Sequence, residues 1–174
     1  MIVSLEDLKK QVTTTMPDDV LKEKLEALEQ TVRKYTNNNF QVRARRAECM
    51  IAAGKLYILH PLFSVGDTVE VSESLYNNGV YTVTEVSDKV VTLSEDLLDE
   101  EHALVTLVRY PADVKQGVIN LMRWDLENRD KVGIASETIS RHSVTYFDMT
   151  GYNSTYGYPK ALMGFLRAYK KART

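Results

Sequence analysis

Apolar side chains recur at every third or fourth position in the N-terminal region, which is the spacing of helices that bury one face. A short helix is predicted to begin at Ser4, where Asp7 nearly completes a capping box. A longer helix is predicted to follow Pro17 and to end at the asparagine run 37–39. Both are interpreted as scaffold, and the alternative is that the polar face of the longer helix packs against a second copy. The apolar stripe of the longer helix consists of Leu21, Leu25, Leu28, Val32 and Tyr35.

The period of the pattern changes to two at Phe40, and short stretches then alternate apolar and polar residues as far as Tyr110. Asn78–Gly79 is a hairpin-turn signal, and the stretch 87–89 predicts another turn. Ala53–Gly54 interrupts an earlier stretch of the same kind. Several short strands at this spacing predict a small antiparallel barrel that resembles SH3-like barrels.

Helical spacing returns after Tyr110–Pro111. A broad apolar face predicts a central core helix that begins at Ala112 and ends before Gly133. Trp124 belongs to that face, so we expect it in the core with its indole N–H bonded to a partner.

The stretch from Gly133 to Tyr169 is harder to place in a core. Residues 139–146 alternate as a strand or hairpin arm does, and 148–158 is a loop with three tyrosines. Loops of such length inside compact domains are usually functional or disordered, and tyrosine is enriched at interfaces. Pro159 is expected to open an amphipathic helix. We interpret the loop and this helix as a docking arm, and the alternative is that the helix packs on its own domain.

Together these patterns predict an α+β fold. We expect a helical adaptor core of about four helices, formed by residues 1–39 and 111–174 and carrying the C-terminal docking arm. Residues 40–110 are expected to form an inserted small antiparallel β-barrel-like module.

Composition places the 174-residue chain among ordinary globular proteins, with 44% hydrophobic and 26% charged residues. The formal net charge of −2 excludes a strongly basic protein that would bind nucleic acid or anionic membrane with its whole surface. Cys49 is the single cysteine, so no internal disulfide is possible, and it is expected to be buried. No signal peptide or apolar run long enough for a bilayer is recognised, so we expect a soluble intracellular chain when made.

Candidate chemistry is sparse along the chain. The histidines His60, His102 and His142 are far apart, and no zinc, nucleophile or phosphate-loop motif is present. The acidic run 95–101 lacks the alternating ligands and glycine of a calcium loop, and a solvated loop or a single helical turn is expected instead. The arginines at 43, 45 and 46 are interpreted as exposed surface rather than phosphate contacts. We therefore expect no enzyme activity, no metal and no cofactor.

Four parts follow one another along the chain: a helical pair ending in YTNNNF, a helix opening at YPADVKQGVINLMRWDLENR, the run GIASETISRHSVTY, and a terminal YPKAL…LRAYKKAR. This order resembles the head–tail connector proteins (adaptor or head-completion proteins) of long-tailed double-stranded DNA phages. The most specific part is Ser136 to Tyr146, directly after the helix. The strand-rich stretch 40–110 exceeds what the smaller, mainly helical members carry.

The resemblance implies a structural protein of the virion neck, assembled in the host cytoplasm. Copies of such proteins form a ring, commonly a dodecamer, between the portal protein and a stopper or tail-completion protein. The ring surrounds the channel through which double-stranded DNA leaves, so DNA passes without specific binding, and no membrane is involved. A ring needs a heterologous interface that closes by rotation. The near-neutral net charge is compatible with a channel wall along which DNA slides.

C-terminal segments of these proteins dock on the portal. Carried to this chain, the resemblance implies that portal docking falls on Tyr152, Tyr156, Tyr158, Leu162, Phe165, Leu166 and Tyr169. The stretch 139–146 is expected to add a strand to a neighbouring copy, which is the usual use of an exposed edge. The subunit-pairing residues would then be Ile139, Val144 and Tyr146. The alternative function is a non-enzymatic binding module whose barrel holds a peptide, glycan or nucleic acid.

Overall fold

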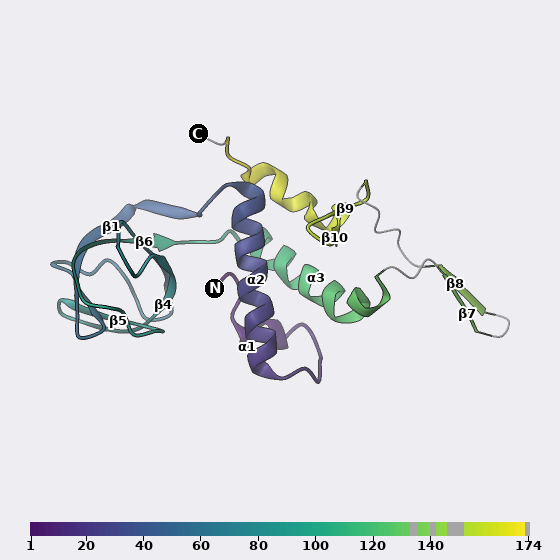
Figure 1. Cartoon of the computed structure of the whole chain (residues 1–174), viewed down its shortest axis with the longest axis horizontal. Helices are drawn as coiled ribbons and strands as arrows, with labels where there is room; N and C mark the ends of the chain where they lie inside the picture. Colours follow the sequence, from purple (N-terminus) through teal and green to yellow (C-terminus); the bar gives the residue numbers. More distant parts are fainter. Residues whose placement is uncertain (133–135, 140–141, 146–151, 173–174) are drawn as a thin grey trace. The chain divides into compact units, whose positions relative to one another are not determined.

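The computed structural model of the chain describes residues 1–132, 136–139, 142–145 and 152–172, and for 131, 136–139 and 142–145 it describes the backbone only. The chain divides into two compact units (Figure 1). The barrel unit comprises Met1 and Asn39–Tyr110, and the helical unit comprises Ile2–Asn38 and Pro111–Thr174.

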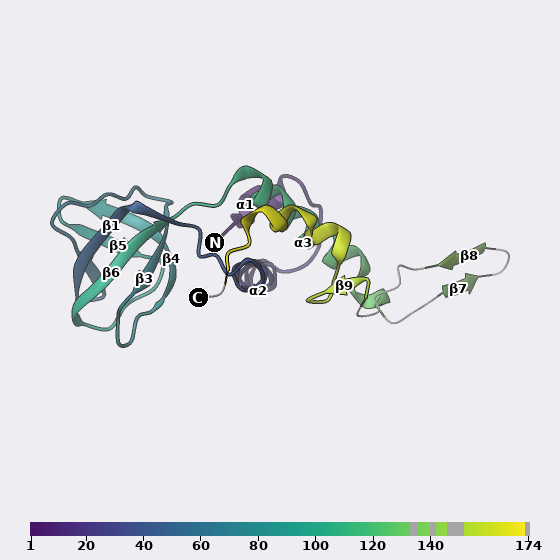
Figure 2. The ribbon, with the colours of Figure 1, turned by 90° about the horizontal axis from the view of Figure 1, so that it is seen from above.

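The barrel unit is a closed, fully antiparallel sheet with the strand order β1-β2-β5-β4-β3-β6 (Figure 2). Consecutive strands pair as β1–β2 and β3–β4–β5, while the pairings β2–β5, β3–β6 and β1–β6 close the sheet. The strands are β1 (Gln41–Ala52), β2 (Lys55–Tyr57), β3 (Thr68–Ser72), β4 (Gly79–Ser87), β5 (Val90–Leu93) and β6 (Glu100–Val108).

Closure depends on β1, which pairs with both β2 and β6 along its length. Its register with β6 shifts between Gln41 and Arg46 and again between Cys49 and Ile51. Such bulges bend a strand and increase its twist, which lets one strand turn the corner of a barrel. The β1–β2 turn uses Ala53 and Gly54, both with positive φ, as two-residue hairpin turns require.

The interior of the barrel is filled by its own side chains, so any ligand of the barrel has to bind on the outside or at the loops. The buried apolar residues come from all six strands and from the loops that cover the barrel ends. They are Cys49, Ile51, Leu56, Ile58, Phe63, Val69, Val71, Val83, Val91, Leu93, Leu97, Ala103, Val105 and Leu107.

The expected fold class, a helical core of about four helices with an inserted small barrel-like module, is wrong. Helices hold 35% and strands 30% of the residues, and the sheet is a complete six-stranded barrel. The physical reason is the pairing of β1 with β6, which joins residues about sixty positions apart. The alternation of apolar and polar residues along the chain predicts strands but does not show which strands pair. Because closure satisfies every strand and encloses a separate core, the barrel is a structural unit in its own right.

The turn signals were correct in part. Asp88 and Lys89 connect β4 to β5, as predicted. Asn78–Gly79, in contrast, is not a two-residue hairpin turn, because the β3–β4 connection spans Glu73–Asn78 and Glu73 has a φ of 57°.

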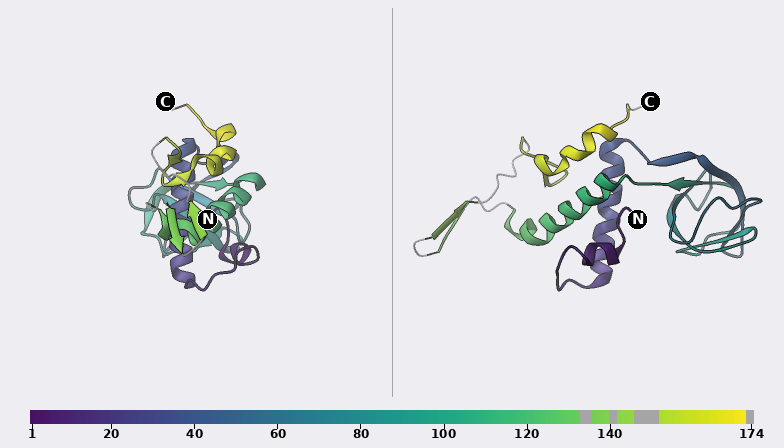
Figure 3. Two further views of the ribbon diagram at one scale, coloured as in Figure 1. Left: turned by 90° about the vertical axis from the view of Figure 1, so that its right-hand side faces the viewer. Right: turned by 180° about the vertical axis from the view of Figure 1, so that it is seen from behind.

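The helical unit contains the N-terminal helices, the helix that follows the barrel and the C-terminal segment (Figure 3). Its helices are α1 (Leu5–Lys9), α2 (Asp18–Thr36) and α3 (Ala112–Asn128), with the 3₁₀ helices η1 (Arg129–Lys131) and η2 (Lys160–Tyr169). Its strands form two separate hairpins, β7 (Ser136–Ile139) with β8 (His142–Thr145) and β9 (Ser154–Thr155) with β10 (Tyr158–Pro159). No helix in the described ranges is both long and apolar enough to cross a membrane.

The helix ends follow the predicted capping. Ser4 accepts a hydrogen bond from the backbone N–H of Asp7 at 3.1 Å. Asn37 ends α2 in the left-handed conformation, and the N–H of Asn38 bonds to the carbonyl oxygen of Arg33 at 3.2 Å. The Ser4 hydroxyl and the backbone N–H of Asn38 thus satisfy groups that a helix end leaves unpaired.

The C-terminal segment packs on the helical unit itself, with η2 against α3 and α2. Met163 and Leu166 are fully buried. The N–H of Lys171 donates to the carbonyl oxygen of Thr36 at 2.8 Å, and the Asn37 side chain donates to the carbonyl oxygen of Ala172 at 2.8 Å. The polar end of α2 therefore fixes the chain beyond η2.

Candidate docking surface

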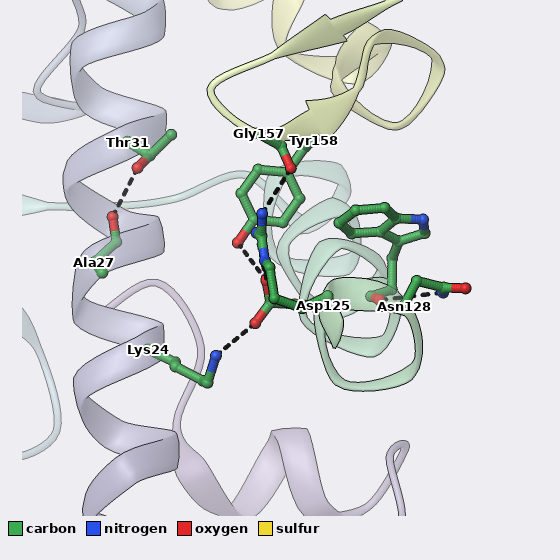
Figure 4. A network of polar contacts seen from close by, with 9 residues as sticks. Lys24, Ala27, Thr31, Asp125, Asn128, Gly157 and Tyr158 are labelled. Atoms are coloured by element: carbon green, nitrogen blue, oxygen red, sulfur yellow. Dashed lines mark hydrogen bonds and ion pairs between the residues drawn. The ribbon is translucent and has the colours of Figure 1, made fainter. Parts of the chain in front are cut away.

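Asp125 of α3 is the centre of a buried polar cluster in the helical unit (Figure 4). Its side chain is only 4% exposed. Lys24 of α2 donates to Oδ2 at 2.7 Å, and Nε of Arg129 donates to Oδ1 at 2.6 Å. The hydroxyl of Tyr158 donates to Oδ1 at 3.3 Å. We call these four residues the Asp125 cluster; it joins α2, α3, η1 and β10.

The carboxylate of Asp125 is charged because its partners outweigh its burial. Burial alone raises a carboxyl pKa, but the hydrogen bonds and charges of Lys24 and Arg129 lower the pKa of Asp125 below its usual value. A buried charge is tolerated when it is paired and hydrogen-bonded. The cluster is consequently a fixed anchor rather than a titrating group at neutral pH.

Arg129 extends the cluster to the C-terminal segment. Its Nη1 donates to the carbonyl oxygen of Gly157 at 2.9 Å, and its guanidinium lies 4.7 Å from the ring centroid of Tyr158 and 5.4 Å from that of Trp124. Burial raises the pKa of Tyr158 to about 12, helped by the negative charge of Asp125. Trp124, expected in the core, is half-buried beside Tyr158. The cluster thereby holds the β9–β10 hairpin on α3.

Two tyrosines in or next to the β9–β10 hairpin are exposed to solvent. Tyr152 is 85% and Tyr156 56% exposed. The Tyr156 ring meets Tyr35 of α2 edge-on, with 6.1 Å between centroids. Lys160 lies 5.0 Å from the centroid of Tyr152, and Lys170 lies 3.9 Å from that of Tyr35. Tyr152, Tyr156 and Lys160, which we call the tyrosine face, combine two exposed rings with a cation, a composition typical of binding surfaces.

The seven expected portal-docking residues thus fall into three groups. Tyr152 and Tyr156 are exposed; Tyr158 and Leu166 are buried; the remainder are half-buried on η2 and are Leu162, Phe165 and Tyr169. The hydroxyl of Tyr169 donates to the carboxylate of Asp113 at 2.8 Å.

Two of the expected subunit-pairing residues lie in one hairpin. Ile139 pairs with His142 across β7 and β8, and Val144 pairs with Glu137. Tyr146 lies outside the described residues. Among the described strands, β7 and β8 pair only with each other.

Sequence reasoning did not identify the Asp125 cluster. The available signal was a carboxylate within the apolar face of the predicted core helix, between Trp124 and Leu126. A charged residue in that position needs a buried partner, and Lys24 supplies it from a distant part of the chain.

The other candidate residues remain apart. His60 and His102 are exposed, and the side chain of His142 is not described. Within the described residues, no three His, Cys, Asp or Glu side chains are placed to hold a metal ion. Arg45 bonds to the carbonyl oxygen of Leu62, and Arg46 donates to Thr106 at 3.2 Å. Cys49 is buried, as predicted.

No protein-family model matches the chain, and no curated protein has a matching sequence.

Proposed function

We propose that the chain is a structural, non-catalytic subunit of a phage neck, a head–tail adaptor whose copies form a ring between the portal and a stopper or tail-completion protein. The observation that carries this proposal is the β7–β8 hairpin, whose described strands pair only with each other. A two-stranded hairpin is marginally stable alone in water. Pairing with a neighbouring copy supplies the missing strand contacts, as edge strands commonly do in assemblies.

The portal is proposed to bind the tyrosine face. Tyr152 and Tyr156 are exposed on a segment that the Asp125 cluster anchors to α3, so docking them requires little ordering. The buried Tyr158 and Leu166 then support the face from below instead of contacting the portal. Double-stranded DNA passes through the ring without specific binding, and the ring resides in the virion neck.

Point variants at the tyrosine face test portal docking. Tyr152→Ser and Tyr156→Ser are expected to weaken binding to purified portal rings, because each removes exposed aromatic area without opening the core. Tyr57→Ser is the matched control, since Tyr57 is a partly exposed tyrosine of the barrel unit. Binding measured by co-sedimentation that is equal for all three variants and the unchanged protein would refute portal docking by this face. Truncation before η2 is less informative, because it removes the buried Met163 and Leu166.

A backbone substitution tests the hairpin. Val144→Pro removes a strand N–H within β8, whereas Val144→Ile keeps it. We expect rings on portal particles, counted by electron microscopy, to be lost with proline and retained with isoleucine. If the Val144→Pro variant is folded, as judged by circular dichroism, and still forms rings, strand pairing is excluded as the ring contact.

A further inference from the structure

Two adjacent loops of the barrel unit present three strongly exposed large apolar side chains. Leu75 and Tyr76 on the β3–β4 connection are 82% and 68% exposed, and Leu98 on the β5–β6 connection is 62% exposed. Large apolar groups gathered on one surface typically mark an interaction site. We call residues 73–79 and 94–101 the loop patch.

The loop patch is held rigid by buried polar groups. Asn77, which is 4% exposed, donates from Nδ2 to the carbonyl oxygen of Leu98 at 2.9 Å and accepts from its N–H at 2.8 Å. Glu100 accepts from the N–H of Leu75 at 2.5 Å, from Nδ2 of Asn77 at 2.7 Å, and from the hydroxyl of Ser74. These hydrogen bonds join the two loops, so the apolar side chains extend from an ordered backbone.

The loop patch is also strongly acidic. It contains six carboxylates and no lysine or arginine. The carboxylates are Glu73, Glu95, Asp96, Asp99, Glu100 and Glu101. An apolar centre with an anionic border favours a partner that combines apolar or aromatic groups with cations.

The helical unit presents a surface of the opposite charge. Residues 30–38 and 161–172 contain five cations and no carboxylate. The bond from the N–H of Lys171 to Thr36 brings the two segments together, and Lys170 lies against Tyr35. Tyr169, within this surface, donates to the carboxylate of Asp113. We call this the basic patch; its exposed cations include Lys34, Arg167, Lys170 and Lys171.

We propose that the loop patch of one copy binds the basic patch of the next copy, which assigns the barrel a role in ring assembly. The two patches differ, so their contact is heterologous and continues from copy to copy until a ring closes. Opposite charges steer the approach, and the apolar groups of the loop patch add contact area beside Tyr35. This inference rests on the proposed ring and specifies one of its contacts.

Charge reversal tests the pairing on the full-length chain by analytical ultracentrifugation. The unchanged protein is expected to self-associate at low salt and to dissociate as salt screens the contact. E95K/D96K/D99K/E101K and K34E/R167E/K170E/K171E are each expected to raise the dissociation constant about tenfold or more, because each reverses the net charge of its patch and replaces attraction by repulsion. An equimolar mixture of the two variants is expected to associate again, since every reversed patch then meets its complement. Glu85→Lys/Asp88→Lys, exposed elsewhere on the barrel, is the matched control and is expected to change nothing.

Substitutions of the exposed leucines test the apolar part of the contact. Leu75→Ser and Leu98→Ser are expected to weaken self-association while the thermal unfolding midpoint stays unchanged, because both side chains are exposed. Leu59→Ser and Val65→Ser are matched controls, with exposures of 68% and 66% on another loop of the barrel unit.

Several results would overturn the proposal. They are a monomer at every concentration at low salt, association that the reversed variants leave intact, or a mixture that fails to recover. Single-cysteine variants in a Cys49→Ala background, Leu98→Cys mixed with Lys171→Cys, must form the mixed cross-linked dimer; a mixture that gives only cross-linked pairs of one variant, or none, overturns the proposal as well. Portal binding is measured separately, so failure of the adaptor function and failure of this contact are distinguishable.

Discussion

The ring of Phe165 in η2 lies directly on Gly117 of α3. A β-carbon at position 117 would come within 2.3 Å of this ring. Contacts that short are not tolerated, so the absence of a side chain at Gly117 is what admits the ring. One face of Phe165 is therefore occupied within its own chain, and η2 is fitted to α3 at a defined position.

Gly117→Ala should loosen η2 from α3. We predict a loss of about 1–3 kcal/mol in the free energy of unfolding, because the added methyl group overpacks the site and exceeds the gain of about 1 kcal/mol from helix propensity. Urea unfolding followed by circular dichroism measures the change. Gly164→Ala is the matched control, since no atom lies within 4 Å of its β-carbon position. Equal stability of the two variants would contradict the packing described.

Asp125→Asn should destabilise the helical unit by about 2–4 kcal/mol, because it leaves Lys24 and Arg129 without their buried counter-charge. The expected loss lies toward the lower end of the range for broken buried ion pairs, because Lys24 and Arg129 are 33% and 40% exposed and water partly hydrates them in the variant. Glu127→Gln, an exposed position on the same helix, should change stability little. Chemical denaturation of both variants checks the difference.

The same carboxylate predicts the direction of acid destabilisation. The folded-state pKa of Asp125 is below its ordinary value, so its contribution is fully present above about pH 4 and is lost as the pH falls through the lowered pKa. The stability difference between the unchanged protein and Asp125→Asn should therefore shrink on acidification. A difference that grows below pH 4 would show that Asp125 is protonated in the fold.

Cys49 should be inert toward thiol reagents in the folded protein. Its side chain is buried in the barrel, and burial, together with the charge of Glu100, raises the pKa of the thiol to about 11. Ellman's reagent at pH 8 should detect no thiol in native protein and one per chain in denaturant. Leu98→Cys in a Cys49→Ala background should react at once, since position 98 is exposed. Rapid reaction of native Cys49 would mean that the barrel opens readily.

Local features of the fold were predictable because their causes lie close together in sequence. The caps at Ser4 and Asn37 and the limits of α2 follow from side chains within one or two turns. Barrel closure was not predictable, because the bulges in β1 and its pairing with β6 depend on residues far apart. The apolar stripe of η2 indicated a helix but not its contact, since the same stripe suits a neighbouring protein or the chain itself. Gly117 in the predicted core helix was the residue that could have indicated packing of η2 within its own chain.

The closed barrel lowers the tendency of separate chains to pair through strand edges. A sheet without free edges offers no template for strand exchange, so it does not seed aggregation. Among the described strands, open edges occur only in the short hairpins β7–β8 and β9–β10. Strand exchange between chains accordingly has few places at which to start among the described strands.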